Sequence, residues 1–288
     1  MRLTFSLVTV FGLSLLPLAA QVGSKPAPVI EILKESIKEG RGAAHEKVES
    51  DYTTTFRKAN FPGHWFGLSA MSGSSEVWFI EPMPSFGASE EYDQIAQKEP
   101  LKSAIALLDS RDGELRSASH TMWAVFRPDL SYGVDKFNRA KIRYIMAATF
   151  RVRLGKEEDF MTGGKAYFGA FQKAGIDETV LGYQVVAGAP AGTFLFMTMM
   201  PSMKELDGQP ARMQAVRQAM GADAYDKLMK GGGDTFVSIE NTLLQVRPGM
   251  SYPSQETIDA DPAFWKPKPA VKPATAAVPA TAEKKAAQ

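Results

Sequence analysis

The sequence predicts an α+β protein made of two tandem copies of one βαββαβ unit, and three observations support this. The stretch Tyr52-Thr-Thr-Thr-Phe-Arg-Lys-Ala recurs 115 residues later as Tyr167-Phe-Gly-Ala-Phe-Gln-Lys-Ala. The stretch Arg127-Pro-Asp-Leu-Ser-Tyr recurs 120 residues later as Arg247-Pro-Gly-Met-Ser-Tyr. The segments around these matches show the same order of strand and helix patterns. Each copy spans about 110 residues, the size of one small domain.

In the first copy, apolar alternation predicts strands over 29–37, 64–71, 76–81 and 116–126. The first of these fits a helix equally well, but its partner 144–152 is rich in β-branched and aromatic residues, which favours a strand. Apolar residues from Ala44 to Ala59 recur every three or four positions and predict a helix. A second helical region over 88–110 should break near residues 97–99 and restart at Pro100.

The second copy repeats this order. We expect strands over 144–152, 179–186, 193–199 and 236–246, with a helix from about Phe160 to Ala174. A second helical region over 209–230 should be stopped by Gly231-Gly-Gly. Each copy is thus a ferredoxin-like unit, whose four-stranded antiparallel sheet has both helices on one face. The bare faces of the two sheets should cover each other, forming a pseudo-dimeric α+β barrel.

This tandem βαββαβ layout, with the strand, glycine-led helix and hairpin of residues 30–73, resembles the dimeric α+β barrel superfamily. Its NIPSNAP-like and antibiotic-biosynthesis-monooxygenase-like branches are the nearest in layout. The resemblance covers about residues 28–252 and implies a fold rather than an activity, because no catalytic motif of the superfamily can be placed on the sequence. Some members of the wider superfamily bind haem.

The ends of the chain differ in composition from the middle. Residues 1–20 have one positive charge, an apolar run and small residues before Gln21, which predicts a cleavable signal peptide and a periplasmic or secreted protein. An uncleaved anchor is the alternative. The run is too short for a membrane span, so none is expected after cleavage. A connector (21–27), repeat 1 (28–135), a linker (136–140) and repeat 2 (141–253) follow. Residues 254–288, rich in Lys, Pro and Ala, predict a disordered tail.

Charge and cysteine content exclude several classes of function. The formal net charge is +1, but the segment from Phe264 onward carries five Lys against one Glu, and Arg2 lies in the signal region. Subtracting these (1 − 4 − 1) leaves about −4 on the folded part, which argues against nucleic acid as a partner. The sequence has no Cys, so disulfides, thiolate nucleophiles, Cys-ligated metals and a lipidated N-terminal Cys are excluded. The oligomeric state is left open between monomer and homodimer.

The last strand of each copy supplies the candidate catalytic pair. If Val237 and its alternates face the helices, then Phe236, Ser238, Glu240, Thr242 and Leu244 face the space between the sheets. The 120-residue offset places His120 at the position of Glu240. An imidazole and a carboxylate there could act as acid and base, could bind a metal together with His64, or could simply line a polar barrel. With three His and no Cys, we expect no metal site, and no cofactor is evident.

Other residues are candidates for ligand binding. His64 begins a strand and could be a ligand or an ordinary surface residue. Trp65, Trp78 and Tyr183 could line an apolar pocket or simply belong to the core. Arg127 and Arg247 could hold an anion through paired hydrogen bonds. Their presence in both copies favours a structural role, because the two repeats share what the fold needs.

These observations leave three functions open. The first is an exported protein that binds a small, largely apolar molecule between the two half-barrels. The second is a cofactor-independent oxygenase or isomerase in which His120 or Glu240 moves a proton. The third is a structural or interaction module of the cell envelope, with exposed strand edges and a basic tail.

Overall fold

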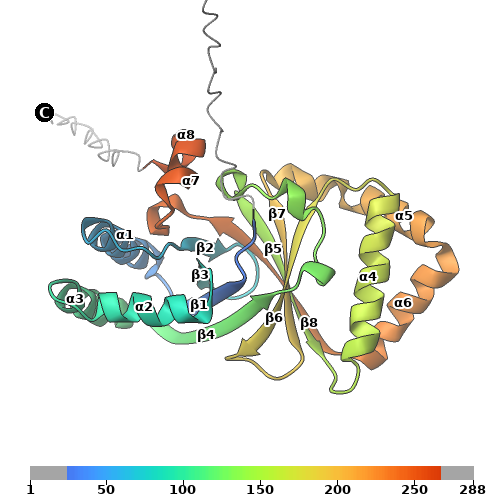
Figure 1. Ribbon diagram of the computed structural model, residues 1–288, viewed down its shortest axis with the longest axis horizontal. Coiled ribbons are helices and arrows are strands. Elements are labelled where there is room, and N and C mark those ends of the chain that lie inside the picture. The colour runs from blue at the N-terminus through green and yellow to red at the C-terminus, as the bar shows by residue number, and fades with distance from the viewer. Residues whose placement is uncertain (1–24, 267–288) are drawn as a thin grey trace, which may run out of the picture.

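Eight antiparallel strands form one closed barrel in the order β1-β3-β2-β8-β5-β7-β6-β4. The computed structural model describes residues 25–266; the expected signal peptide, most of the connector and the end of the expected tail lie outside this range. Two groups of helices lie on opposite sides of the strands (Figure 1). The protein is therefore a mixed α+β structure whose strands lie between two helical layers.

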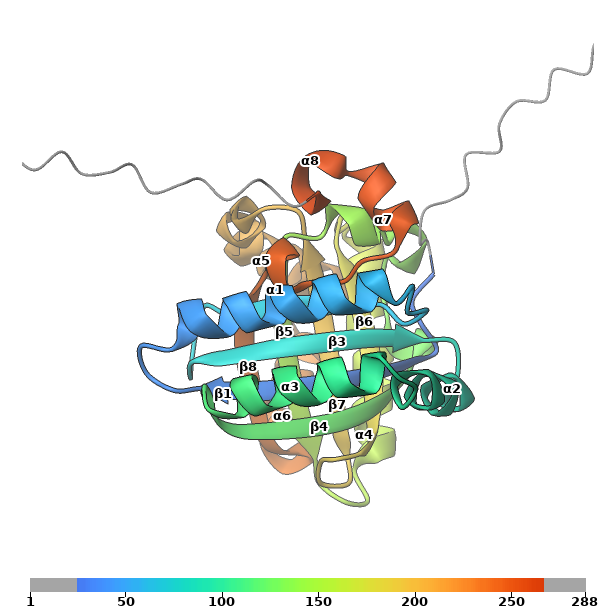
Figure 2. The same ribbon diagram turned by 90° about the vertical axis from the view of Figure 1, so that its left-hand side faces the viewer.

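The first half of the barrel comes from the N-terminal part of the chain. Its strands are β1 (Val29–Ile37), β2 (Phe66–Ala70), β3 (Glu76–Met83) and β4 (Arg116–Phe126). Its helices are α1 (Gly42–Lys58), α2 (Phe86–Ala96) and α3 (Leu101–Gly113). Figure 2 shows α1 and α3 lying across the outer face of these strands. The expected break near Pro100 is present: α2 ends at Ala96, and Pro100 is the N-cap of α3.

The second half contains β5 (Tyr144–Val152), β6 (Thr179–Ala187), β7 (Thr193–Met200) and β8 (Phe236–Val246). Its helices are α4 (Glu157–Lys173), α5 (Gln209–Met220) and α6 (Ala222–Thr235). The strand order β8-β5-β7-β6 matches β4-β1-β3-β2 of the first half. All eight expected strands are therefore present, and their bounds differ from the expected ones by two residues at most.

One helix departs from the expected pattern. We expected Gly231-Gly-Gly to end it, but α6 continues through these glycines to Thr235. The helical region is interrupted earlier, at Gly221, which separates α5 from α6. Gly221 has a φ of +88°, a value that glycine adopts easily and other residues rarely adopt. A glycine in a helix interior destabilises the helix by about 1 kcal/mol relative to alanine. This weak propensity does not end α6 at the three glycines.

The two halves are joined at two seams, β2 against β8 and β4 against β6. At each seam the repeated Arg-Pro-x-x-Ser-Tyr element of one half is bonded to a strand of the other half. Ser131 accepts a hydrogen bond from the amide of Gly182 (2.9 Å), and Ser251 accepts one from the amide of Gly67 (3.0 Å). We call these two contacts the seam clasps.

The interior of the barrel is a packed apolar core. Ile32, Leu68, Ala124 and Leu244 are fully buried, and Trp78 is 1% exposed. We expected a ligand space between the facing sheets, but these side chains fill that space. Interdigitated side chains are the usual content of an eight-stranded barrel.

Two short helices pack at one end of the barrel. Residues that we assigned to the tail form α7 (Gln255–Ala260) and α8 (Pro262–Trp265), shown above the barrel in Figure 1. Trp265 is buried in the barrel core and its indole N–H donates to the carbonyl of Ala140 at 2.9 Å. Asp261 forms an ion pair with Arg143. Composition alone favoured disorder here, whereas one buried tryptophan and one ion pair fix the segment.

Candidate ligand-binding cavity

A cavity of about 980 Å³ lies in the second half, between the outer face of its sheet and the helices α4, α5 and α6. This volume falls in the range of small-molecule sites, about 300–1,000 Å³. The cavity is outside the barrel, so it differs in place from the ligand space expected between the two sheets.

The floor of the cavity follows from strand alternation. Met146, Ala148 and Phe150 occupy alternate positions of β5, and Phe196 and Thr198 do the same on β7. Alternate residues of a strand point to one face, so these side chains face the helices rather than the barrel core. Sequence periodicity predicted this apolar outer face, but it could not show that the helices stand far enough away to leave a space.

The wall formed by α4 combines aromatic residues with glycines. Phe160, Tyr167 and Phe171 recur along one side of α4 and line the cavity. Gly163 lies where α4 approaches α6, since a Cβ there would be 2.7 Å from Cδ1 of Leu228. Gly164 lines the cavity with no side chain to fill it.

The cavity is rich in aromatic side chains. Seven of its lining residues are aromatic: Phe150, Phe160, Tyr167, Phe168, Phe171, Phe196 and Phe236. The Phe150 ring lies 5.2 Å from that of Phe236 and 5.4 Å from that of Phe196. These separations suit edge-to-face and tilted aromatic packing. Flat, apolar molecules are the ligands that such a surface accommodates.

Phe236 lies on the helix side of β8, although alternation placed it on the barrel side. The register of β5 and β8 shifts between Arg151 and Val152, so Val152 is opposite Phe236. Such a β-bulge inserts one extra residue into a strand, and here the Phe236 side chain is turned to the other face of β8 as a result. Ser238 and Glu240 lie beyond the bulge, opposite Arg151 and Thr149.

A polar group of side chains lies at one side of the cavity. Arg212 forms an ion pair with Glu178 and donates a hydrogen bond to the carbonyl of Glu205. The Tyr167 hydroxyl donates to Sδ of Met213 at 3.3 Å. Burial, with Tyr225 and Glu178 nearby, raises the pKa of Tyr167 to about 12. Burial also raises the pKa of Glu178, and the charge of Arg212 opposes this rise.

The two predicted arginines are held by internal bonds. Arg127 donates through Nε and Nη2 to the carboxylate of Asp129, and through Nη1 to Gln184. Arg247 donates to both carboxylate oxygens of Glu46 at 2.8 and 3.0 Å. Both arginines flank the seam clasps, which accords with the structural interpretation of the repeated element.

The other predicted ligand-binding residues also lie away from the cavity. The Trp65 indole donates to the carbonyl of Met250 at 2.9 Å. Trp78 and Tyr183 are buried in the barrel core. His64 lies beside Tyr252, with ring centroids 5.2 Å apart. Its Nδ1 is buried without a hydrogen-bond partner among the described residues, and burial lowers its pKa.

His120 is exposed on β4, and Glu240 is exposed on β8. Three other strands lie between β4 and β8 in each direction around the barrel. No hydrogen bond or ion pair joins them among the described residues. His120 is opposite Lys34 in the register of β1 and β4. Burial lowers the pKa of Lys34, and the charges of Glu76 and Glu240 oppose this. The two predicted catalytic residues therefore belong to a polar barrel end and do not line the cavity.

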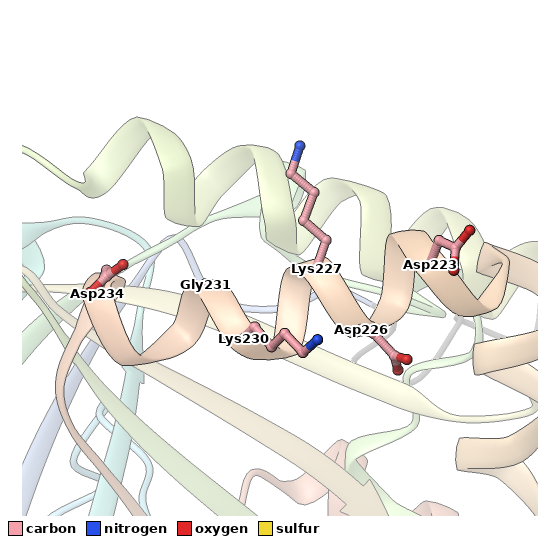
Figure 3. Close-up of a pocket in the computed structure, with 6 residues that line it drawn as sticks. All are labelled: Asp223, Asp226, Lys227, Lys230, Gly231 and Asp234. Atoms are coloured by element: carbon pink, nitrogen blue, oxygen red, sulfur yellow. The ribbon is translucent and has the colours of Figure 1, made fainter.

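A second hollow lies on the surface of α6 and is shallow. All six of its residues belong to this one helix, and Figure 3 shows their charged side chains pointing in different directions. Such an arrangement is the solvated face of a helix. It offers no group of converging side chains.

The cavity does not fit a histidine-ligated haem. The lining residues include no histidine, and the chain has no cysteine. The three histidines of the chain lie elsewhere: His45, His64 and His120. Among the described residues, no helix is long and apolar enough to cross a membrane.

Comparisons with solved structures identify the fold. A proposed monooxygenase from Fusobacterium nucleatum matches with a TM-score of 0.51 at 10% identity, over 77% of this chain and 93% of that one. An anthrone oxidase-like protein matches with a TM-score of 0.51 at 12% identity, over 81% and 96%. A variant chlorite dismutase from Candidatus Nitrospira defluvii matches with a TM-score of 0.50 at 8% identity, over 84% and 98%. The chain has the dimeric α+β barrel fold.

This fold agrees with the resemblance drawn from the sequence. At identities of 8–12%, the comparisons show the fold alone. No family model matches the sequence, and no curated protein matches it.

Sequence reasoning missed the residues that line the cavity. The signal present in the sequence was the difference between the segments that form α1 and α4. Where α1 has Thr53 and Thr54, α4 has Phe168 and Gly169 at the 115-residue offset, and the aromatic content of α4 is higher. This difference marks the second half as the one with an aromatic helix–sheet interface.

Proposed function

We propose that this protein binds a small, largely apolar aromatic molecule in the cavity of its second half. One observation supports this most directly, which is a space of about 980 Å³ lined by seven aromatic side chains. Apolar surface buried on binding contributes about 25 cal/mol per Å², so an aromatic ligand gains affinity there without strong polar contacts. Arg212 and the Tyr167 hydroxyl would orient a polar substituent.

We also infer that the two halves are copies of one ferredoxin-like unit. Matching strand order, matching strand registers and the repeated clasp support this inference. Export to the periplasm or the medium remains part of the proposal, since it rests on residues 1–20. We further propose that the protein acts as a monomer or a homodimer.

The binding proposal can be tested with a fluorescent probe, 1-anilinonaphthalene-8-sulfonate. Ala148 lies on the floor of the cavity, whereas Thr121 is exposed on β4 outside it. We expect saturable binding to the wild type and at least tenfold weaker binding to Ala148→Phe, because the added ring fills the space. Thr121→Phe adds the same ring and should bind as the wild type does. Equal binding by all three proteins would contradict the proposal.

An oxygenase that acts without a cofactor is the second candidate. The observation that favours it is Glu178, a lining carboxyl whose pKa is raised by burial and which could accept a proton from an acidic C–H group. The anthrone oxidase-like neighbour suggests anthrone as a probe. If the protein is such an enzyme, it should increase oxygen uptake in the presence of anthrone, and Glu178→Gln should abolish this increase. Probe binding without oxygen uptake would favour the binding function.

A further inference from the structure

Four titratable side chains meet in the first half of the molecule, away from the cavity. Glu35 comes from β1, His45 and Glu49 from α1, and Asp112 from the end of α3. All four are buried, and one potential ligand atom of each lies within 4.8 Å of the others. We call these four residues the His45 cluster.

The three carboxylates of the cluster compete for one imidazole nitrogen. Nε2 of His45 lies 2.9 Å from Glu35 Oε2, 3.3 Å from Asp112 Oδ1 and 3.8 Å from Glu49 Oε1. This nitrogen can donate at most one proton, and its hydrogen bond goes to Glu35. The other two carboxylates point at the same nitrogen without receiving a proton from it.

One of these carboxylates lacks a partner that burial demands. Asp112 is 2% exposed, and its Oδ1 has no hydrogen-bond partner among the described residues. Glu49 is 6% exposed, and its Oε1 lies 3.8 Å from the imidazole. Buried polar groups almost always have partners, so an unsatisfied oxygen that faces an imidazole and two other carboxylates calls for an explanation. A cation bound between these groups would supply that explanation.

The charge of the cluster leads to the same conclusion. Arg116 is the cation that contacts it, through an ion pair with Glu35 and another with Asp112 at 3.2 Å. With a neutral imidazole, three carboxylates and one guanidinium leave a charge of −2 (−3 + 1), which one divalent cation would neutralise.

The second half shows that the fold does not need these charges. The two halves can be compared position by position. The register of β1 matches that of β5, and this places Glu35 at the position of Phe150. The helices α1 and α4 both have 17 residues, so His45 corresponds to Phe160 and Glu49 to Gly164. Counting back from the matched first residues of β4 and β8 places Asp112 at the position of Gly232. All four counterparts line the apolar cavity. Buried ion pairs are weak evidence for stability, so this charged set needs another explanation.

We propose that Glu35, His45, Glu49 and Asp112 bind one divalent first-row transition-metal ion of the Zn²⁺, Mn²⁺ or Fe²⁺ class. One imidazole nitrogen with carboxylate oxygens suits these ions better than Ca²⁺ or Mg²⁺, which take oxygen ligands and, for Mg²⁺, several waters. Four buried protein ligands leave no position for substrate, as in closed structural zinc sites. The ion would fix α1 and α3 against β1.

We expect an ion to enter the site past Arg116. The Arg116 side chain is 25% exposed, while the carboxylates of Glu35 and Asp112 that it contacts are 3% exposed. Movement of this one flexible side chain would open the cluster to solvent. Metal binding should therefore be reversible by a chelator, with no need to unfold the protein.

The test uses the untagged chain, freed of metal with a chelator and titrated with Zn²⁺ and, separately, Mn²⁺. We expect one equivalent to bind by calorimetry and the melting temperature to rise with metal concentration. Glu49→Gln keeps the shape of the side chain and removes its charge, and it should weaken binding at least tenfold. His120→Gln removes an exposed histidine outside the cluster and should bind as the wild type does. Circular dichroism without metal checks that each variant is folded.

Three results would overturn the proposal. The first is a wild-type protein whose melting temperature none of these ions raises. The second is binding lost in His120→Gln and kept in Glu49→Gln, which would indicate an adventitious ion at the exposed histidine. The third is an X-ray absorption spectrum of the zinc-loaded protein that shows no imidazole ligand. A spectrum with one imidazole and the remaining ligands oxygen would support the site, even if Glu49→Gln failed to fold.

Discussion

Ser131 and Ser251 make the same two hydrogen bonds at the two seams of the barrel. Ser131 donates to the carbonyl of Arg127 at 2.7 Å and accepts from the amide of Gly182. Ser251 donates to the carbonyl of Arg247 at 2.8 Å and accepts from the amide of Gly67. In each case one hydroxyl bonds a turn of its own half to a strand of the other half.

Removal of the Ser251 hydroxyl should destabilise the whole protein. Ser251 is 2% exposed, so Ser251→Ala leaves a buried amide at Gly67 without its partner. The expected loss is about 1–3 kcal/mol of unfolding free energy, measured by denaturant unfolding. Ser119 is exposed on β4, and Ser119→Ala should change the free energy by less than about 0.5 kcal/mol. Equal effects of the two substitutions would count against the clasp.

Two glycine-to-alanine substitutions should have opposite signs. Gly231 lies inside α6, and a Cβ there meets no atom within 4 Å, so Gly231→Ala should stabilise the protein by about 0.5–1 kcal/mol. At Gly182, a Cβ would lie 2.2 Å from the carbonyl oxygen of Leu130. Gly182→Ala must therefore push the seam apart and lower the melting temperature. Thermal unfolding of the two variants distinguishes these effects, and a shift of the same sign in both would contradict the structure.

Glu81 should make the protein less stable as the pH rises. Burial, and the charge of Glu31 opposite it on β1, raise the pKa of Glu81 from an ordinary value of 4.5 to about 7. Between these values the folded state holds more protons than the unfolded state. This contribution to stability is therefore complete below pH 4.5 and is lost as the pH rises through 7.

Glu81→Gln should remove this dependence on pH. The variant is expected to match the wild type near pH 4 and to be more stable near pH 8, on the order of 3 kcal/mol. Thermal unfolding across this range measures the difference. Glu90 is exposed on α2, and Glu90→Gln should follow the wild type at every pH. A constant difference between Glu81→Gln and wild type from pH 4 to pH 8 would rule out titration of Glu81 as the cause.

The strands could be predicted from the sequence because alternation survives in each of them, and because Tyr144–Val152 resolved the ambiguity of Val29–Ile37. The face assignment of Phe236 failed because a bulge is a property of two paired strands and leaves no mark in one of them. The end of α6 could not be predicted, since the low helix propensity of glycine is a small effect that the surrounding structure can override.

The sites were harder to predict than the fold. The cavity depends on how far α4 stands from its sheet, a distance that no local pattern contains. The His45 cluster draws on β1, α1 and α3, and Asp112 is 67 positions from His45 along the chain. The packing of α1 and α3 over β1 brings these residues together. The 120-residue offset paired His120 with Glu240, yet matching positions of the two halves lie on opposite sides of the barrel.

The seam clasps also limit what either half can do alone. Each half supplies the serine that satisfies the other half's glycine amide, so a separated half would expose one unpaired amide and two open strand edges. A gene fragment that encodes a single half should therefore yield an insoluble or self-associating product. Two complementary fragments made in the same cell should assemble into a closed barrel, because each fragment supplies the strand edges and the serine that the other fragment lacks.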